Sequence, residues 1–457
     1  MTDTVYDMVI LGAGSGGYAA ALRGAQLGLK VALIEADKVG GTCLHRGCVP
    51  TKAILHAAET ADTVREASAL GIRAALEGID MPAVKAYKDG IISRMHKGLQ
   101  GLVASRGIDL IQGWGRLVAP DAVEVDGRRI TGKNVILASG SYSKDIGQEI
   151  SGPVMTSEQA LELDHVPASA VILGGGVIGV EFASAWASLG CQVTIIEGLP
   201  RLVPNEDEAI SKQLERAFRK RKIAFRTSTM FESVERHEDS VTVRAADGTT
   251  YYAEVLLIAV GRGPATANLG YEEVGVSMDR GFVLADEYGR TSVPGVWAVG
   301  DIVPGVQLAH RGFAQGIVVA EKIAGLDPTP VDDVLVPKVT FCEPEIASVG
   351  LSEAAAKELH GEDAITTAEF NVAGNAKSQI LGTQGFVKLV SLKDGPILGF
   401  HAIGARMGEQ VGEGQLMVSW EADADDVASL VHAHPTQNET LGEAAMALAG
   451  KPLHNHG

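Results

Sequence analysis

The chain has 457 residues, which is too long for one hydrophobic core and predicts two to four domains. Its 46% hydrophobic and 21% charged residues, with 55 glycines, are typical of a globular protein that contains nucleotide-binding turns. The formal net charge of −18 argues against a nucleic-acid partner, because binding to phosphates requires a basic surface.

Other features of the sequence bear on its cellular compartment. No apolar run approaches the length of a membrane span, so we expect no membrane partner. The first predicted strand is preceded by acidic Asp3 rather than a basic segment, so we expect no signal peptide. Cys191 and Cys342 are isolated, which excludes a disulfide framework of the secreted kind. We therefore expect a cytoplasmic protein, in which a close cysteine pair is more often catalytic than structural.

The chain begins with a predicted dinucleotide-binding unit. A strand, a G-x-G-x-x-G turn, a helix and a second strand are predicted over residues 6–11, 12–17, 18–28 and 30–34. In such a unit Gly12 makes the tight turn, Gly14 lets the backbone approach a pyrophosphate, and Gly17 permits close packing of helix on strand. Glu35 follows the second strand and can accept a hydrogen bond from ribose hydroxyls.

Two cysteines five residues apart, Cys43 and Cys48, follow this unit directly. In a regular helix the Cα atoms of residues i and i+5 lie roughly 8–9 Å apart, which is too far for a disulfide. A bond between them would therefore require an interruption of the helix, which Gly47 and Pro50 can provide. The alternative is a pair of small buried hydrophobic side chains, since free cysteines usually behave in that way.

The dinucleotide-binding pattern occurs a second time. A strand, a glycine-rich turn, a helix and a second strand are predicted over residues 170–173, 174–179, 180–189 and 192–196. Gly174, Gly176 and Gly179 correspond to the three glycines of the first unit, and Glu197 lies 23 positions after Gly174, as Glu35 does after Gly12. An isolated glycine motif is weak evidence, but two complete copies predict a flavin and a nicotinamide that exchange electrons.

Three further segments have less specific patterns. An apolar strand over residues 291–301 ends at Asp301, which can accept from the ribityl hydroxyls of a flavin or can be an ordinary turn residue. The basic stretch 216–222 is predicted to be a solvated helix end rather than a phosphate clamp. The histidines of the tail, residues 452–456, are predicted to lie in a solvated terminus, and we expect no metal site.

These motifs resemble those of the pyridine-nucleotide disulfide oxidoreductases over nearly the whole chain. Residues 40–52 resemble the redox-active disulfide motif, and residues 258–262 resemble the strand that closes a nicotinamide domain. Residues 300–301 match the second flavin motif, and residues 432–439 match the C-terminal catalytic motif. The departure is His-Arg at residues 45–46, where many members carry Asn and an aliphatic residue.

The resemblance implies an α/β fold with four regions. Two Rossmann-like dinucleotide-binding domains, for FAD and NAD, are followed by a central domain and a C-terminal α+β dimerisation domain, so we expect a homodimer. The expected domains are residues 1–148, 149–275, 276–333 and 334–457. The restart of strand–turn–helix patterning near residue 170 and the Pro-rich segment 327–337 agree with this division.

The resemblance also implies catalytic roles. Cys43 would be the thiol that exchanges with substrate, and Cys48 would lie against the flavin. His434, supplied by the other subunit, would take up and return protons, because a histidine near its ordinary pKa can do so at neutral pH. Glu439 would orient the ring of His434 and stabilise its imidazolium. We expect His432 to be structural.

Several cofactor contacts follow from the resemblance. Lys52 and Glu181 would form an ion pair beside the reactive edge of the flavin, since a buried lysine needs such a partner. Glu197 predicts NAD rather than NADP, because a carboxylate accepts from a ribose 2′-hydroxyl and repels a 2′-phosphate; Arg201 is the nearby residue that argues the other way. The remaining implied cofactor contacts are Thr42, Gly115, Gly261, Gln307, Leu308, Ala309 and His310.

The implied activity is oxidation of protein-bound dihydrolipoamide to lipoamide with reduction of NAD, and the implied partners are lipoyl domains of a 2-oxo acid dehydrogenase or glycine cleavage complex. One alternative is an NADPH-dependent reductase of a small disulfide, against which Glu197 argues. Another is a non-catalytic flavin-bearing scaffold subunit, which would need none of Cys43, Cys48, His434 and Glu439. Single-thiol oxidases and transhydrogenases of the same fold are disfavoured because both cysteines are present.

Overall fold

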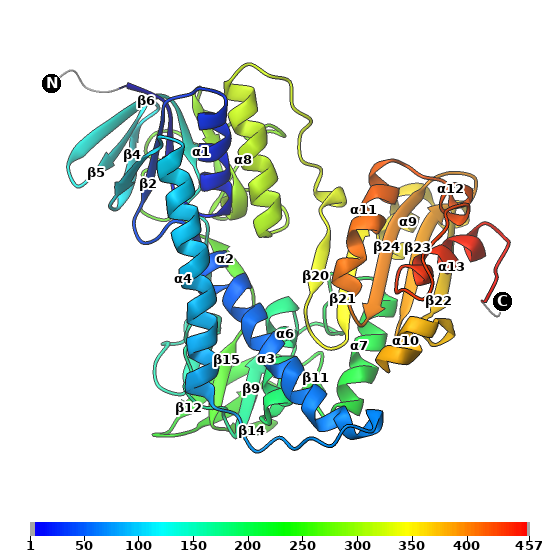
Figure 1. Ribbon diagram of the computed structural model, residues 1–457. Coiled ribbons are helices and arrows are strands. Elements are labelled where there is room, and N and C mark those ends of the chain that lie inside the picture. The colour runs from blue at the N-terminus through cyan, green and yellow to red at the C-terminus, as the bar shows by residue number, and fades with distance from the viewer. Residues whose placement is uncertain (1–4, 455–457) are drawn as a thin grey trace.

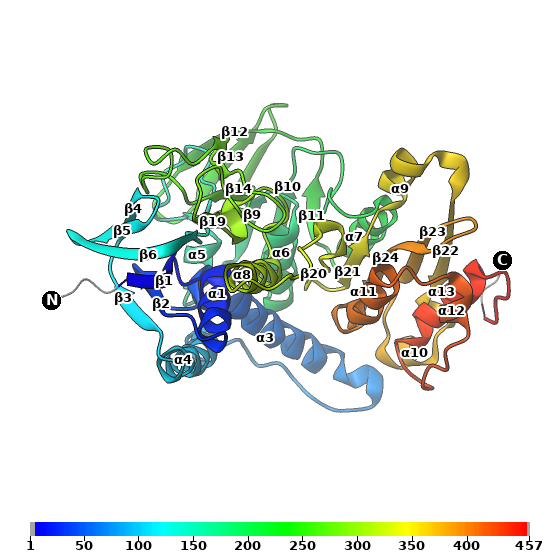
Figure 2. The same cartoon turned by 90° about the horizontal axis from the view of Figure 1, so that it is seen from above.

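A computed structural model describes residues 5–454 (Figure 1). Two units built on mainly parallel sheets are followed by a C-terminal unit built on an antiparallel sheet. In the view from above, the C-terminal unit lies at the opposite end of the molecule from the first unit (Figure 2). This architecture confirms the predicted α/β class and its C-terminal α+β region.

The first unit has a sheet in the order β3-β2-β1-β6-β5-β4, in which β19 also pairs with β6. The pairs among β3, β2, β1, β6 and β19 are parallel, while β5 and β4 extend the sheet in antiparallel fashion. Its strands are β1 (Val5–Leu11), β2 (Val31–Glu35), β3 (Asp109–Gln112), β4 (Gly115–Ala119), β5 (Ala122–Val125), β6 (Arg128–Leu137) and β19 (Val296–Ala298). Its helices are α1 (Ser15–Gln26), α4 (Met81–Ser105) and α8 (Ala309–Ile323). The predicted strand–turn–helix–strand order is therefore present.

The segment with the two cysteines forms two helices that lead from the first unit toward the second. These are α2 (Gly41–Arg46) and α3 (Cys48–Glu66). Gly47 separates them with φ −143° and ψ −109°, which is not a helical conformation. The interruption that a bond between the two cysteines would require is therefore present.

The second unit has a fully parallel sheet in the order β11-β10-β9-β15-β8. Its strands are β8 (Val154–Thr156), β9 (Ser169–Leu173), β10 (Gln192–Ile196), β11 (Ala224–Arg226) and β15 (Val255–Ile258). An antiparallel meander accompanies it, formed by β12 (Phe231–Arg236), β13 (Val241–Ala245) and β14 (Thr250–Ala253). Its helices are α5 (Ser157–Ala160), α6 (Val177–Leu189) and α7 (Glu208–Lys220).

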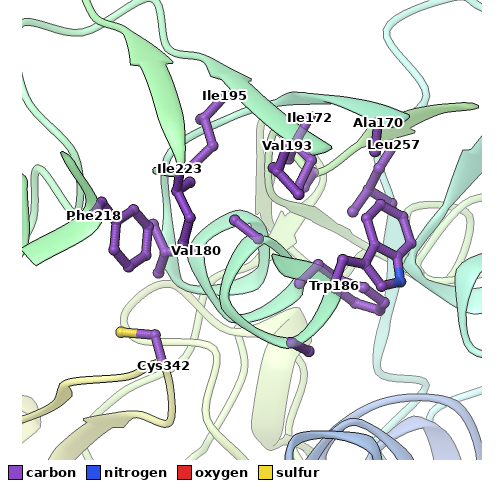
Figure 3. Close-up of a cluster of buried hydrophobic side chains, with 14 of the residues drawn as sticks. Ala170, Ile172, Val180, Trp186, Val193, Ile195, Phe218, Ile223, Leu257 and Cys342 are labelled. Carbon is purple, nitrogen blue, oxygen red and sulfur yellow. The ribbon is translucent and has the colours of Figure 1, made fainter. Parts of the chain in front are cut away.

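The core of the second unit lies between α6 and the sheet. Figure 3 shows Trp186 of α6 reaching toward Leu257 of β15, and Cys342 of the C-terminal unit lies in the same buried cluster. The prediction of a solvated helix end at residues 216–222 is wrong at Arg221. Its guanidinium donates to Ser184 Oγ (2.7 Å) and Ser188 Oγ (2.6 Å), because the end of α7 packs against α6.

Short antiparallel strand pairs connect the larger units. They are β7 (Ser141–Ser143) with β16 (Arg262–Pro264), and β17 (Met278–Asp279) with β18 (Phe282–Val283). The region predicted as a central domain also contributes β19 to the first sheet and α8 to its cover. The domain boundaries at residues 148, 275 and 333 stay predictions.

The C-terminal unit has an antiparallel sheet in the order β20-β21-β24-β23-β22. Its strands are β20 (Lys338–Thr340), β21 (Glu345–Gly350), β22 (Ile365–Asn371), β23 (Phe386–Leu392) and β24 (Ile397–Gly404). Its helices are α9 (Glu353–His360), α10 (Ala376–Leu381), α11 (Val411–Ser419), α12 (Ala424–Ala428) and α13 (Glu439–Leu448). One face of the sheet packs with α11 and α13 in a hydrophobic cluster that includes Val349, Leu389 and Phe400. Within residues 5–454, none of the helices combines the length and apolarity needed to cross a bilayer.

Candidate active site

A cavity of about 1250 Å³ extends between the two dinucleotide units and reaches the C-terminal unit. It brings together residues that are far apart in the sequence, from Gly14 to Ala309. The predicted site residues that line it are Thr42, Cys43, Cys48, Lys52, Gly14, Gly174, Gly176, Glu181, Glu197, Gly261, Asp301, Gln307, Leu308 and Ala309.

The turn of the first unit has the geometry that the glycine motif predicts. Gly12 has φ +104°, and a Cβ there would collide with the carbonyl oxygen of Ala138. A Cβ on Gly17 would collide with the carbonyl oxygen of Gly12, so the helix packs against the turn without a side chain between them. Glu35 Oε2 accepts from the Ala13 N–H at 2.7 Å, which ties the acidic residue to the turn.

The turn of the second unit repeats this geometry. Gly174 has φ +104°, and a Cβ there would collide with the carbonyl oxygen of Ala259. A Cβ on Gly179 would meet the carbonyl oxygen of Gly174. Glu197 Oε2 accepts from the Gly175 N–H at 2.5 Å. Gly12, Gly17, Gly179 and Glu35 shape the turns from outside the cavity lining, whereas Glu197 lines the cavity.

Both turns fit a pyrophosphate. Gly14 is the N-cap of α1 and Gly176 is the N-cap of α6, and a Cβ at either residue would have no neighbour within 4 Å among the described atoms. No side chain within residues 5–454 caps either helix, so their first N–H groups can donate to an anion at the positive end of the helix dipole. The residues present therefore suit a dinucleotide at each turn, the first in contact with the thiol segment.

The two cysteines form a polarised pair of thiols. Cys43 lies in α2, Cys48 is the first residue of α3, and both sulfurs are free. The hydrogen bond from Cys43 lowers the pKa of Cys48 to about 7; burial opposes this shift and the Lys52 ammonium assists it. The same hydrogen bond, together with burial, raises the pKa of Cys43. Near neutral pH the pair therefore holds a thiolate on Cys48 and a thiol on Cys43.

The predicted ion pair lies next to the thiols. Lys52 Nζ is 2.9 Å from both carboxylate oxygens of Glu181, and the Glu181 side chain is only 3% exposed. Phe341 of the C-terminal unit completes the arrangement: its backbone N–H donates to Glu181 Oε1 at 2.9 Å, and its ring lies 4.8 Å from Lys52 Nζ. Because Lys52 lies four residues after Cys48, the ammonium and the sulfur occupy the same side of α3. Phe341 was not foreseen from the sequence.

A second polar chain lies on the cavity wall. Ser141 Oγ donates to Asp301 Oδ2 at 2.5 Å, and Arg262 Nε donates to Ser141 Oγ at 2.8 Å. Asp301 therefore has a defined orientation and retains oxygen lone pairs for a hydroxyl-bearing ligand. Ser141 and Arg262 were missed as site residues. Their signal was weak, because each follows a glycine at the end of a buried strand, Gly140 and Gly261 respectively.

Two predicted cofactor residues lie outside the cavity lining. Gly115 begins β4, where an added Cβ would press against the side chains of Leu11 and Ile34. His310 is exposed, and its Nε2 lies 2.7 Å from the carbonyl oxygen of Pro337, at the entry to the C-terminal unit. Their contacts with a cofactor stay predictions.

The predicted proton-transfer pair is formed, but far from the thiols. His434 Nδ1 lies 2.7 Å from Glu439 Oε1, and the His434 side chain is 72% exposed. Burial opposes the shift, but the Thr436 N–H and the His434 ring hold the pKa of Glu439 below its usual value. Neither His434 nor Glu439 lines the cavity. Helix α13, which begins at Glu439, lies apart from α3 in both views, in the C-terminal unit at one end of the molecule (Figures 1 and 2).

Other histidines have structural partners. His432 Nε2 lies 2.8 Å from Glu413 Oε1, in agreement with the structural role expected for it. In the C-terminal tail, His454 Nδ1 lies 2.6 Å from Glu443 Oε1, while Asn455 and His456 lie outside the described residues. Among residues 5–454, no group of three or more potential ligands is arranged to hold a metal ion.

Comparisons with known proteins agree with this geometry. A family model described as pyridine nucleotide-disulphide oxidoreductase matches residues 6–316, and one described as the dimerisation domain of such proteins matches residues 336–445. A dihydrolipoyl dehydrogenase of Bacillus subtilis (strain 168) is 38% identical, and the alignment covers 99% of each chain.

Two solved structures are also similar to the chain. The crystal structure of LpdA from Mycobacterium tuberculosis matches with a TM-score of 0.90 and 26% identity, over 96% of this chain and 99% of that one. The HOCl-induced flavoprotein disulfide reductase RclA from Escherichia coli matches with a TM-score of 0.86 and 27% identity, over the same shares of the two chains.

Proposed function

Because the chain belongs to the pyridine nucleotide-disulphide oxidoreductase family, we propose that it oxidises protein-bound dihydrolipoamide to lipoamide with NAD as the electron acceptor. The observation that carries the proposal is the polarised thiol pair, Cys43 and Cys48, in a cavity that runs from one dinucleotide turn to the other. Members of the family bind FAD and a pyridine nucleotide, and both turns have the open N-terminal amides that such ligands need.

The reaction balances as a transfer of two electrons. Dihydrolipoamide carries two thiols, and its oxidation to the cyclic disulfide reduces the Cys43–Cys48 disulfide to the thiol and thiolate pair. FAD held at the first turn would carry the two electrons from this pair to NAD, so that the overall reaction forms lipoamide, NADH and one proton. Gly14, Thr42, Lys52 and Asp301 are the residues proposed to hold the flavin.

The two cysteines have different tasks. Exchange begins when a substrate thiolate attacks Cys43, which breaks the enzyme disulfide and forms a mixed disulfide, with the electron pair passing to Cys48 as leaving group. The lowered pKa of Cys48 makes it a good leaving group, and Cys43 is then released when the second substrate thiolate closes the lipoamide ring.

Lys52 and Glu181 orient and stabilise the charged form of the pair. The Lys52 ammonium favours the thiolate on Cys48, and Glu181 holds that ammonium with both oxygens. The Lys52 ammonium lies beside the Phe341 ring, and the buried Glu181 carboxylate at hydrogen-bond distance is its counter-charge. The proposed role of Lys52 is therefore to stabilise the negative charge of the Cys48 thiolate.

Proton transfer is assigned to His434 and Glu439 of the partner subunit, reaching the thiols of the first. The dimerisation region of the family supports a homodimer. The exposed ring of His434, held by Glu439 at 2.7 Å, is suited to meet a thiol on a second copy of the chain. The proposed carboxylate role is to fix the tautomer of the ring and stabilise its imidazolium.

The nucleotide is proposed to be NAD. Glu197 is 8% exposed, and its carboxylate is fixed by the N–H groups of Gly175 and Leu199 at the edge of the cavity. A carboxylate in that position accepts from a 2′-hydroxyl and repels a 2′-phosphate. Arg201 does not oppose this preference, since its guanidinium donates to the carbonyl oxygens of Pro204 and Glu206.

A second candidate is nicotinamide-dependent reduction of a small disulfide. The similarity to RclA, described as a flavoprotein disulfide reductase, favours it, and the same thiols would work in the opposite direction. A comparison of rates separates the two candidates: dihydrolipoamide with NAD against NADPH with small disulfides. We expect the first reaction to be faster by at least an order of magnitude, and faster reduction of small disulfides by NADPH would favour the second candidate.

The proposed partners are lipoyl domains of a 2-oxo acid dehydrogenase or glycine cleavage complex, and the shared active site can be tested by complementation. A Cys48→Ser chain and a His434→Ala chain, each nearly inactive alone, are co-expressed with different affinity tags. In a mixed dimer one site carries both lesions, while the other combines intact thiols with an intact histidine. Random assortment makes about half of the dimers mixed, so roughly a quarter of wild-type activity should return.

Purified mixed dimers, isolated through both tags, should have about half of wild-type activity per dimer. A co-expressed pair that carries Cys48→Ser on one chain and Cys43→Ser on the other is the matched control, because no site in its mixed dimer has two thiols. Background activity in the first mixed dimer would show that each site is built within one subunit, contrary to the proposed role of His434.

A further inference from the structure

A row of polar residues crosses one face of the C-terminal sheet. Cross-strand pairing places one residue of each strand in register, and antiparallel partners project to the same side of a sheet. The row, here called the polar row, is Lys338 in β20, Ser348 in β21, His401 in β24, Lys388 in β23 and Glu369 in β22. The neighbouring registered residues Ala347, Ala402 and Val387 belong to the hydrophobic cluster on the opposite face.

The polar row contacts two consecutive carboxylates of the second dinucleotide unit. Ser348 Oγ donates to Glu206 Oε2 at 2.5 Å, and Lys338 Nζ lies 3.7 Å from Glu206 Oε1. Lys388 Nζ lies 2.9 Å from Asp207 Oδ1. Figure 1 shows α7, which begins directly after Asp207, beside the strands of the C-terminal sheet.

These contacts are buried and charged. Lys388 is 6% exposed and Asp207 is 3% exposed, so each would carry a large desolvation penalty without the other. Burial alone would lower the pKa of Lys388, but Glu353 and Asp207 raise it. Burial lowers the pKa of His401, which keeps the imidazole between the two lysines of the row uncharged. Three members of the row, Lys338, Ser348 and Lys388, are thus cations or donors directed at the second unit.

The two carboxylates terminate a loop that forms the wall of the nucleotide part of the cavity. The loop, residues 198–207, begins after Glu197, and Gly198, Leu199, Pro204, Asn205 and Glu206 line the cavity. At its start, Leu199 N–H donates to Glu197 Oε1 at 2.7 Å, a contact within the second unit. At its end the loop is held by the C-terminal unit, through Ser348 and Lys388.

We propose that the polar row is a positioning device for the nicotinamide nucleotide: Ser348 and Lys388 hold loop 198–207 in its binding conformation and so set the affinity for the nucleotide. The inference deepens the proposed function, on which it rests for the identity of the nucleotide. It means that the unit that forms the dimer also shapes the nucleotide site of its own chain.

The rival explanation is that the row only joins two units. The two units are also joined by a shared hydrophobic cluster. In it, Ile346, Phe386 and Ile403 of the C-terminal unit lie in the same cluster as Phe218 of the second unit. That cluster is untouched when a row residue is changed, so variants of the row should fold and dimerise. A joining role predicts unchanged nucleotide affinity in such variants, and a positioning role predicts weaker binding.

The first experiment compares two buried serines of the same sheet. Ser348→Ala removes the hydroxyl that donates to Glu206, whereas Ser391→Ala removes a hydroxyl that contacts carbonyl oxygens near its own strand. NAD and NADP are each titrated into the oxidised, FAD-loaded dimer by calorimetry. We expect Ser348→Ala to weaken binding of the preferred nucleotide by about fivefold or more, at the low end of coupling between sites, and Ser391→Ala to leave it unchanged.

The second experiment uses the ion pair. Lys388→Met should weaken nucleotide binding more than Ser348→Ala does, whereas Lys388→Arg should keep most of the wild-type affinity. In an Asp207→Asn background, Lys388→Met should have a smaller effect on affinity, because Lys388 and Asp207 act through one contact. In steady state the KM for NAD should rise while kcat at saturating NAD and the KM for dihydrolipoamide stay close to wild type. Gel filtration should give wild-type dimers.

The outcomes separate this inference from the proposed function. Unchanged nucleotide affinity in folded, dimeric Ser348→Ala and Lys388→Met would overturn the inference, whatever the substrate. A wild-type enzyme that binds NADP in preference to NAD would overturn the proposed acceptor. In that case, weaker NADP binding in Ser348→Ala and Lys388→Met would still support the positioning role of the polar row.

Discussion

The two dinucleotide turns have nearly the same local geometry but different surroundings. Gly12 and Gly174 both have φ +104°, and in each turn the acidic residue accepts from the N–H that follows the first glycine. The helices differ in their neighbours. α1 packs against α8 so closely that a Cβ on Gly316 would collide with the carbonyl oxygen of Gly16 (Figure 1).

The second turn has different neighbours. α6 packs against α3, which carries the thiol and the lysine, and the wall opposite is a loop held at its far end by another unit. The first turn thus lies beside a helix–helix contact, and the second lies beside a loop whose far end is held by the C-terminal unit. We expect the same motif to hold a resident group in the first setting and an exchanging substrate in the second. The predictions below test this contrast.

The largest effects on cofactor binding are expected at Gly17 and Gly179, where an added side chain would push the helix away from the glycine turn that precedes it. Gly17→Val should prevent the first unit from packing and abolish FAD incorporation, since overpacking costs about 1–3 kcal/mol or more and here meets backbone. Gly179→Val should leave FAD bound and abolish nucleotide binding. Flavin absorbance, melting temperature and NAD titration measure these outcomes. Gly101→Ala, in an open position on α4, is the control and should behave as wild type.

The next largest effects are expected at Gly14 and Gly176, the two turn glycines with free space around an added Cβ. Gly14→Ala and Gly176→Ala meet no atom within 4 Å, so both variants should fold with wild-type melting temperatures. Only a ligand competes for that space, so Gly176→Ala should weaken NAD binding by roughly thirtyfold, which corresponds to about 2 kcal/mol of overpacking. Gly14→Ala should lower FAD content instead. Equal effects of the two variants on NAD affinity would contradict the assignment of one ligand to each turn.

The two acidic residues should differ in their effect on cofactor choice. Wild-type enzyme should prefer NAD over NADP by at least tenfold, and Glu197→Gln should reduce that ratio by about tenfold, because a charge-assisted hydrogen bond and a repulsion are both lost. Glu35→Gln is the matched control, since it changes the same chemistry at the other turn. Ratios of kcat/KM for the two nucleotides give the answer. An unchanged ratio in Glu197→Gln would refute its role.

The smallest effect is a pH dependence of the thiol pair between the turns. The pKa of Cys48 is lowered from 9.0 to about 7, so its thiolate is present above that pH and is lost as the pH falls through it. Between pH 6 and pH 8 the thiolate fraction should rise from about a tenth to about nine-tenths. A long-wavelength absorbance of the two-electron-reduced enzyme should follow this rise. Cys48→Ser should lose the absorbance, whereas Cys43→Ser should retain it.

Local patterns predicted the parts of the fold that depend on neighbouring residues. The turns, their flanking strands and the interruption at Gly47 follow from glycine, proline and apolar spacing, and they are present. The pairing of Lys52 with Glu181 came from family resemblance, since nothing local joins residues 129 positions apart. Arg221 was misjudged because burial of its guanidinium depends on α6, an element distant in sequence.

Residues that act through the register of distant strands could not be predicted. Phe341 meets Glu181 only because β20 ends beside α6, and its sequence neighbours carry no motif for that contact. The polar row is spread over residues 338–401, and its members are ordinary polar residues within alternating strands until pairing aligns them. Their shared face is a property of sheet order, which single-sequence patterns do not contain.

Cys48, the first residue of the 19-residue helix α3, lies beside the Cys43 thiol and the Lys52 ammonium, and this environment has an electrochemical consequence. Its lowered pKa means that the reduced pair is stabilised as a thiolate, while the disulfide form carries no charge to stabilise. Reduction of the pair is therefore easier than for two ordinary cysteines, and its reduction potential is shifted upward. The hydrogen bond from Cys43 and the Lys52 ammonium thus make this disulfide a better oxidant than an ordinary pair, and the difference grows as the pH rises from about 7 toward the ordinary cysteine pKa of 9.0.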